Sequence, residues 1–218
     1  MVGKFLVIGL GRFGSNLAIQ ITRGGRAVLA VDRSPKLVQE LAAVVDSAVC
    51  LDSTDELALR ELGIDDVACA VVAIGSESIE SSILTTSLLR QMGVPRLIAR
   101  AVTELHGRVL YAVGAHEVVN PEQQMGRRLA RQLAYPGLLE HIELGDAAEI
   151  AEVEVPEAWI GRTLVELDVR RNYNLSVMAI RRGGKVMATL AGDERMESGD
   201  VLITIGPPRT IGKLANLV

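Results

Sequence analysis

Three glycines near the start of the chain have the spacing of a phosphate-binding turn. Gly9, Gly11 and Gly14 follow the strand-like run 5–8 and precede a stretch with helical periodicity. In such a turn the first glycine permits the tight bend, the second lets a phosphate approach the backbone, and the third lets the helix pack near the strand. The helix end supplies unpaired N–H groups and a partial positive charge. The motif predicts a diphosphate site, and the alternative is a βα turn without a ligand.

An acidic residue stands where such a site needs one. Asp32 closes the second strand-like run, 27–31, eighteen residues after Gly14. A carboxylate there accepts hydrogen bonds from ribose hydroxyls and repels a 2′-phosphate, which favours an adenosine ribose or NAD over NADP.

Arg12 follows the second glycine and should point into the phosphate region. A guanidinium in that place can fork onto phosphate oxygens, and a triphosphate would use it. The alternative is a solvated surface arginine.

Positioning these residues requires alternating strands and helices, and residues 4–135 show that pattern. The expected strands are 5–8, 27–31, 48–51, 68–74, 96–100 and 117–119. One helix is expected directly after Gly14 and another at 35–43. A third ends at Leu62 and has Asp52-Ser53-Thr54 as its N-cap. Three more are expected at 76–92, 103–113 and 121–135. Six strands suit a complete Rossmann sheet, so the predicted fold class is α/β with a Rossmann-type parallel sheet.

The pattern changes after Pro136-Gly137. Glu140–Glu152 is an acidic, linker-like segment, and after it come short strands at 151–155, 175–181, 185–190 and 201–205, with a hairpin turn at Gly183-Gly184. We therefore expect two domains, a nucleotide-binding lobe at 1–135 with a further helix from about 121, and a hinge plus a small α+β lobe at 136–218.

The composition argues against several classes of function for this chain. Apolar residues make up 49% of the chain, but no run reaches the roughly 18 that span a bilayer, and the N-terminus lacks signal-peptide features. We expect a cytoplasmic protein. The net charge of -4 without a basic run argues against nucleic acid. Cys50 and Cys69 read as small buried hydrophobes, and no metal-ligand spacing appears.

The chain also lacks the residues of a catalyst. Hydride transfer needs a polarising acid or base in the domain after the Rossmann lobe, and His141, the only late histidine, lies in the linker-like stretch. We predict that the chain is not an enzyme. A small NAD-dependent oxidoreductase is the alternative, and a redox-sensing DNA-binding repressor is a weaker one because no basic face is visible.

Several longer segments together resemble one family. They are GLGRFG with Asp32, LDSTDELALRELGIDD, VVAIGSESIESSILTTSLLRQMG, LIARA, GAHEVVNPEQQMGRRLA, and in the tail VPEAWIGRTLVELDVRRNYNLSVMAIRRGGKVM and ERMESGDVLITIGPPRTI. In this order they are similar to the RCK (regulator of conductance of potassium) domains of KtrA- and TrkA-type potassium-uptake regulators, over essentially the whole chain.

The resemblance implies a regulatory subunit. It would form homodimers that assemble into an octameric ring on the cytoplasmic face of a separate membrane-embedded potassium transporter or channel subunit. Helix 121–135 would be the crossover helix between dimer partners, with Met125, Leu129 and Leu133 in a partner groove or in its own core.

The resemblance also implies the ligands, ATP, ADP or NAD(H). It places the nucleotide at Gly9, Gly11, Arg12, Phe13, Gly14, Asp32, Arg33, Asp52, Ser53, Ile74, Gly75 and Arg100. Glu122 would hold a divalent cation at the phosphates, or would simply be a first-turn carboxylate favoured by the helix dipole. Some relatives bind cyclic di-AMP in the C-terminal lobe, where Arg170 and Asn174 correspond; the alternative is a plain dimerisation module.

Overall fold

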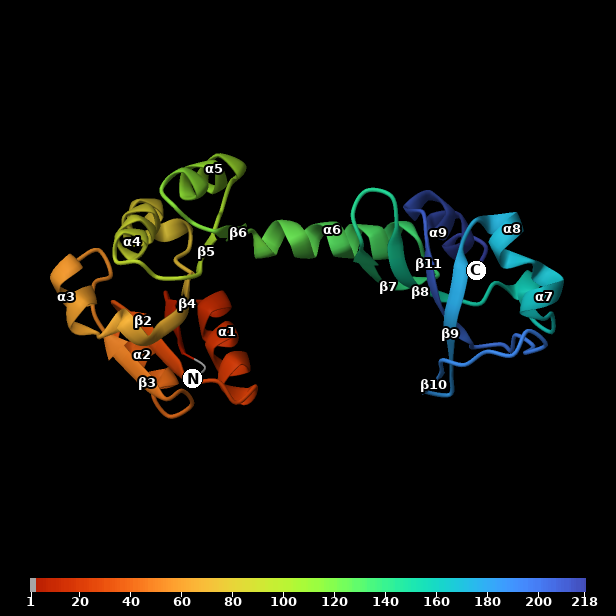
Figure 1. Cartoon of the computed structure of the whole chain (residues 1–218), viewed down its shortest axis with the longest axis horizontal. Coiled ribbons are helices and arrows are strands. Elements are labelled where there is room, and N and C mark those ends of the chain that lie inside the picture. Colours follow the sequence, from red (N-terminus) through yellow and green to blue (C-terminus); the bar gives the residue numbers. More distant parts are fainter. Residues whose placement is uncertain (1–2) are drawn as a thin grey trace. The chain divides into compact units, whose positions relative to one another are not determined.

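The first part of the chain alternates strands and helices around a parallel sheet. The computed structural model describes residues 3–218, which divide into a first unit ending at Glu122 and a second unit, Gln123–Val218 (Figure 1). The strands of the first unit are β1 (Lys4–Ile8), β2 (Val28–Asp32), β3 (Ser47–Cys50), β4 (Val67–Val72), β5 (Leu97–Arg100) and β6 (Glu117–Val119). They lie in the order β3-β2-β1-β4-β5-β6, all parallel, which is the order of the Rossmann sheet.

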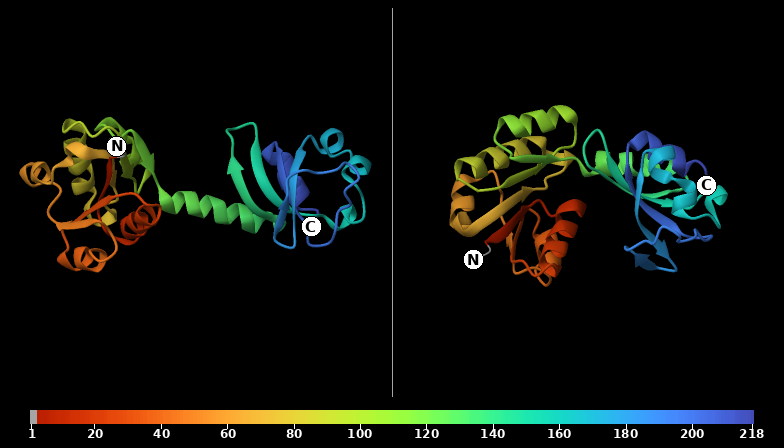
Figure 2. Two further views of the ribbon diagram at one scale, coloured as in Figure 1. Left: turned by 60° about the horizontal axis from the view of Figure 1, so that its bottom comes forward. Right: turned by 45° about the vertical axis from the view of Figure 1, so that its right-hand side comes forward.

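Helices cover both faces of this sheet. They are α1 (Arg12–Arg23), α2 (Pro35–Leu41), α3 (Glu56–Glu61), α4 (Ile79–Gln91) and α5 (Glu104–Ala112), with short 3₁₀ turns at Ile64–Asp66 and Ser76–Ser78. Figure 2 shows α1 in red on one side and α4 and α5 in yellow and green on the other. Because successive strand residues point to opposite faces, Leu6 and Ile8 belong to one hydrophobic cluster and Val7 to the other. This two-sided burial explains the nearly continuous apolar runs of the strands.

The second unit is a small antiparallel sheet with its own core. Its strands are β7 (Leu138–Glu143), β8 (Glu149–Glu154), β9 (Ser176–Arg182), β10 (Lys185–Met187) and β11 (Val201–Gly206), in the order β10-β9-β11-β8-β7. Its helices are α7 (Leu164–Leu167), α8 (Val169–Tyr173) and α9 (Pro208–Ala215), with a 3₁₀ turn at Glu157–Trp159. The core is built around Trp159, Ile180 and Leu202. The predicted fold class, a Rossmann-type sheet followed by a small α+β lobe, is confirmed.

One further helix, α6 (Pro121–Ala134), begins at the end of the first unit and continues into the second. None of its residues is buried, and Met125, Leu129 and Leu133 are exposed at every fourth position. Within residues 3–218, no helix is both long and apolar enough to cross a bilayer.

The acidic segment is structured, which corrects the expectation of a linker. Residues 138–143 form β7, which pairs with β8 at residues 149–154, and His141 lies within β7. Arginines of α6 compensate the acidic charge. Arg131 donates to both carboxylate oxygens of the fully buried Glu149, at 2.7 and 2.8 Å, and Arg128 pairs with Glu140.

Three local expectations are also wrong. Cys50 is exposed, because it ends the edge strand β3, whereas Cys69 in the central strand β4 is buried as expected. The N-cap of α3 is Asp55, whose carboxylate accepts from the N–H groups of Leu57 and Ala58, rather than the expected Asp52-Ser53-Thr54. The strand expected at 185–190 ends at Met187.

An ion pair with one fully buried partner joins β9 to the loop before β11. The side chain of Asp200 is fully buried, and Arg182 donates to its two carboxylate oxygens, each at 2.8 Å. Burial works to raise the pKa of Asp200. The hydrogen bonds from Arg182 and from the backbone N–H of Glu197 outweigh that effect and hold the pKa below its ordinary value.

Arg182→Met should therefore lower the free energy of unfolding of the second unit by about 3 kcal/mol at pH 7, because it leaves a buried carboxylate unpaired. A carboxyl with a lowered pKa stabilises the fold above its ordinary pKa and loses that contribution as the pH falls through the lowered value. The difference in free energy of unfolding between the unaltered chain and Arg182→Met should therefore be smaller at pH 4, where the unpaired Asp200 of the variant takes up a proton. Fluorescence of Trp159, the single tryptophan, monitors this unit in urea.

Arg181→Met is the matched control. It removes the pair of Arg181 with Glu152, in which both side chains are about one-third exposed, and should cost about 1 kcal/mol or less. Equal losses for the two variants would contradict the prediction.

Candidate functional site

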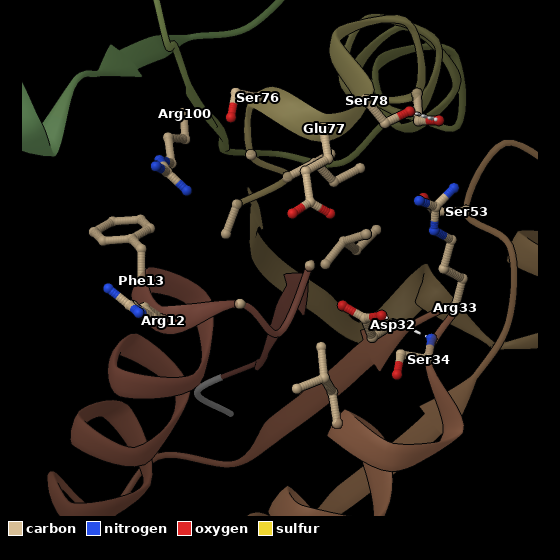
Figure 3. A pocket seen from close by; sticks show the side chains of 18 of the residues that line it. Arg12, Phe13, Asp32, Arg33, Ser34, Ser53, Ser76, Glu77, Ser78 and Arg100 are labelled. Carbon is tan, nitrogen blue, oxygen red and sulfur yellow. Dashed lines mark hydrogen bonds between the residues drawn. The ribbon is translucent and has the colours of Figure 1, made fainter.

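A cavity of about 1080 Å³ opens where β1 to β5 end, at their carboxyl edge. Its walls come from the loops that follow these strands, so residues far apart in sequence meet there (Figure 3). The chain runs from β1 to β2 on one side and reaches β4 on the other side of β1. Such a switch point of a parallel sheet is where ligands bind in this fold class.

The three glycines of the turn have the different roles that the sequence predicts. Gly9 has a φ of +93°, in the region that favours glycine. A Cβ on Gly14 would lie 1.8 Å from the carbonyl oxygen of Gly9, so Gly14 permits the close approach of α1 to β1. A Cβ on Gly11 would meet nothing within 4 Å, and Gly11 lines the cavity. Gly11 thus leaves open space at the N-terminus of α1.

The carboxylate of Asp32 is fixed by the backbone. Its Oδ2 accepts from the N–H of Leu10 at 2.6 Å, and its Oδ1 accepts from the N–H of Ser34 at 2.8 Å. The first bond ties the end of β2 directly to the glycine turn. Each oxygen keeps a second acceptor position, so the carboxylate can receive hydroxyl donors from the cavity without moving.

Three arginines bring positive charge to the cavity. Arg12 and Arg33 make no ion pair with any residue in the described range 3–218, and Figure 3 shows them on opposite sides of the cavity. Arg100 differs, because its guanidinium lies 5.8 Å from the centre of the Phe13 ring and pairs with the carboxylate of Glu122. Two of the three guanidinium groups are therefore free to meet an anion.

The loop after β3 supplies Asp52 and Ser53. The Oδ1 of Asp52 accepts from the backbone N–H and the hydroxyl of Thr54, and these bonds hold the pKa of Asp52 below its ordinary value. Asp52 is thus a charged acceptor at the cavity wall. Ser53 is buried, and its hydroxyl pairs with that of Thr85 at 2.7 Å, which ties the loop to α4.

The cavity brings together every residue predicted for the nucleotide or cation except Gly14, which packs behind the turn. Their roles in binding stay predictions. Part of the wall was not predicted from the sequence: Ile8, Asn16, Ser34, Leu37, Leu51, Ala73 and the run 76–78 with Ser81. The run 76–78 follows the carboxyl end of β4 after three residues, and that position was a usable signal. Within it, the carboxylate of Glu77 points into the cavity (Figure 3).

A metal site formed by the protein alone is not visible within residues 3–218, where no group of three or more His, Cys, Asp or Glu side chains is placed to hold an ion. Glu122 is a single carboxylate, paired with Arg100. Its predicted role therefore needs ligand phosphates to complete the coordination.

Comparisons with known proteins agree with this fold. Residues 5–121 match the TrkA-N domain family and residues 150–218 the TrkA-C domain family. The chain is 35% identical to the Ktr system potassium uptake protein C of Bacillus subtilis, over 100% of this chain and 98% of that protein. It is 33% identical to the Ktr system potassium uptake protein A of Vibrio alginolyticus, over 98% of this chain and 95% of the relative.

Solved structures show the same architecture. The GsuK RCK domain superposes with a TM-score of 0.67 at 19% identity, over 100% of this chain and 48% of that chain. GsuK bound to ADP superposes with a TM-score of 0.50 at 28% identity, over 60% of this chain and 34% of that chain.

Together these features define an RCK protein with a Rossmann-type nucleotide-binding fold. The chain belongs to the family of Ktr- and Trk-type potassium uptake proteins, built from a TrkA-N and a TrkA-C domain. The predicted resemblance is confirmed. The family is one of potassium transport proteins and not of enzymes, in agreement with the prediction.

Two alanine substitutions should show which glycine of the turn is needed for packing and which is not. Gly14→Ala forces a Cβ against the Gly9 carbonyl and should destabilise the first unit by about 1–3 kcal/mol. Gly11→Ala meets no atom and should change its stability by less than about 1 kcal/mol. Thermal unfolding followed by circular dichroism measures both. Trp159 fluorescence from the second unit should not change in either variant, and a Gly11→Ala loss as large as that of Gly14→Ala would refute the assignment.

Proposed function

We propose that the chain is the regulatory subunit of a potassium transporter or channel, which senses an adenine nucleotide in its first unit and signals to a separate membrane subunit. Relatives named as potassium uptake proteins match it over essentially their whole length. The observation that carries the nucleotide part is the cavity, which combines an open glycine-lined helix end, a fixed ribose-type carboxylate and two unpaired arginines.

The proposed ligands are ATP or ADP, with NAD(H) as the other candidate. The N-terminus of α1 beside Gly11 suits a diphosphate. Asp32 suits the ribose, and Asp52 and Gly75 line the wall where an adenine would lie. The GsuK structure with bound ADP, related at 28% identity, supports a nucleotide with a diphosphate.

The proposed signal is the difference between two ligands. A ligand shifts a two-state equilibrium only by the difference between its affinities for the two states, and each factor of ten corresponds to about 1.4 kcal/mol. ATP and ADP differ by one phosphoryl group, which Arg12 can bind in the fork geometry of a guanidinium. Glu122 could approach the same group through a divalent cation. Nucleotide exchange would then change the conformation without breaking any bond.

The proposed assembly is a ring at the cytoplasmic face of the membrane subunit, made of dimers. The exposed apolar face of α6, with Met125, Leu129 and Leu133, suits a second copy of the chain. We therefore assign α6 to the nucleotide lobe as a crossover helix, which makes the functional lobes 1–135 and 136–218.

Arg12→Ala should weaken ATP binding about tenfold more than ADP binding, because the γ-phosphoryl group loses its charge-assisted hydrogen bonds. Titration calorimetry measures both affinities. Arg33→Ala is the matched control, since it removes an unpaired guanidinium from the opposite wall and should affect ATP and ADP equally. Equal weakening of the two nucleotides by Arg12→Ala would remove the γ-phosphate sensor, and an unaltered chain that binds neither nucleotide would refute the proposed function.

The assembly has its own measurement. Gel filtration of the purified chain should show a species near 190 kDa, the mass of eight 23.4-kDa chains, with an elution volume that depends on added ATP. A monomer at every protein concentration would contradict the ring.

A further inference from the structure

We infer that Glu122 and a ligand phosphate compete for Arg100, so that nucleotide binding breaks the Arg100–Glu122 ion pair and releases the Glu122 carboxylate at the start of α6. This inference rests on the proposed function and adds to it the step that follows binding. The two anions, the Glu122 carboxylate and the ligand phosphate, repel each other and compete for one guanidinium within the first unit.

Two contacts hold the Arg100 side chain, one with Phe13 and one with Glu122. It is the last residue of β5, its side chain is 16% exposed, and its guanidinium lies over the Phe13 ring. Its Nε is buried and donates to nothing. The only acid paired with it in the described chain is Glu122, through Nη2. The ion pair with Glu122 is thus the contact that an anion in the cavity would have to replace.

Arg100 also lies at the phosphate end of the cavity. Phe13 belongs to the first turn of α1, and Figure 3 shows Arg100, Phe13 and Arg12 on the same side. Nη1 of Arg100 lies beside Gly75, because a Cβ on Gly75 would be in ordinary van der Waals contact with it at 3.5 Å. An anion drawn to the N-terminus of α1 therefore meets this guanidinium.

The exchange favours the phosphate. The Glu122 side chain is 64% exposed, and exposed carboxylates form weak ion pairs. A phosphate group carries more charge and offers several oxygens to a planar guanidinium, which makes the stronger, forked contact. Once Arg100 has turned to the phosphate, Glu122 is left unpaired beside an anion. It must then move away or bind a cation.

The position of Glu122 gives this step a consequence. Glu122 is the second residue of α6, which starts in the first unit and continues into the second. Loss of the ion pair frees the carboxylate of this residue. The exchange also makes the Oε1 of Glu122, which pairs with Arg100, available to a divalent cation once a phosphate has taken Arg100.

The test is titration calorimetry of the full chain with ADP in the presence of EDTA. Glu122→Gln removes the competing charge and keeps the side-chain size, so ADP affinity should rise about threefold to tenfold. Arg100→Gln should lower it at least tenfold. In the double variant, Glu122→Gln should have no further effect, because nothing is left to compete for. Glu117→Gln is the matched control, since Glu117 pairs with Arg96 outside the cavity and should not change ADP affinity.

The outcomes are distinct. Unchanged or weaker ADP binding by Glu122→Gln, or an equal gain in both Arg100 backgrounds, would overturn the exchange. A chain that binds no nucleotide at all would instead refute the proposed function. Arg100→Lys, which keeps the charge and loses the fork, replaces Arg100→Gln if that variant does not fold, and should also lower the affinity.

Discussion

The structure depends on one constraint, which is that a parallel sheet must be covered by helices on both faces. Strands with two buried faces have no polar surface except at their ends, so polar residues gather where the strands stop. In this chain the loops after β1 to β5 all reach the same edge, and the order of the strands changes direction beside β1. The Asp32 bond to Leu10 joins two of these loops and fixes the floor of the cavity.

The charged side chains of the cavity differ in how many hydrogen bonds and ion pairs they make with the rest of the chain. Asp32 and Asp52 are held by hydrogen-bond donors of the chain, and Arg100 is held by Glu122. Arg12 and Arg33 are left to solvent or to a ligand. An anionic ligand therefore finds prepared acceptors for its hydroxyl groups and unpaired cations for its phosphates. Under the proposed exchange, binding changes ion pairs while the backbone frame stays in place.

Much of this could be predicted from the sequence because the signals are local. The glycine spacing, Asp32 and the repeated strands and helices each fall within short segments, and the fold class and family are confirmed. What failed depends on residues distant in sequence. The acidic strand β7 was taken for a linker because its compensating arginines lie on α6, and Cys50 was expected to be buried because an edge position is invisible in a strand-like run. Residues 76–78 and Ser81 are an exception, because they were missed although they lie shortly after the carboxyl end of β4.

The different exposure of the two cysteines has a practical consequence. Cys50 ends the outer strand of the first unit and faces solvent, whereas Cys69 is enclosed by the sheet. A maleimide fluorophore added to the unaltered chain should thus attach at one defined place. The lone indole of the second unit provides an energy-transfer donor for a suitable dye, so the native sequence already contains a pair of spectroscopic reporters, one in each unit.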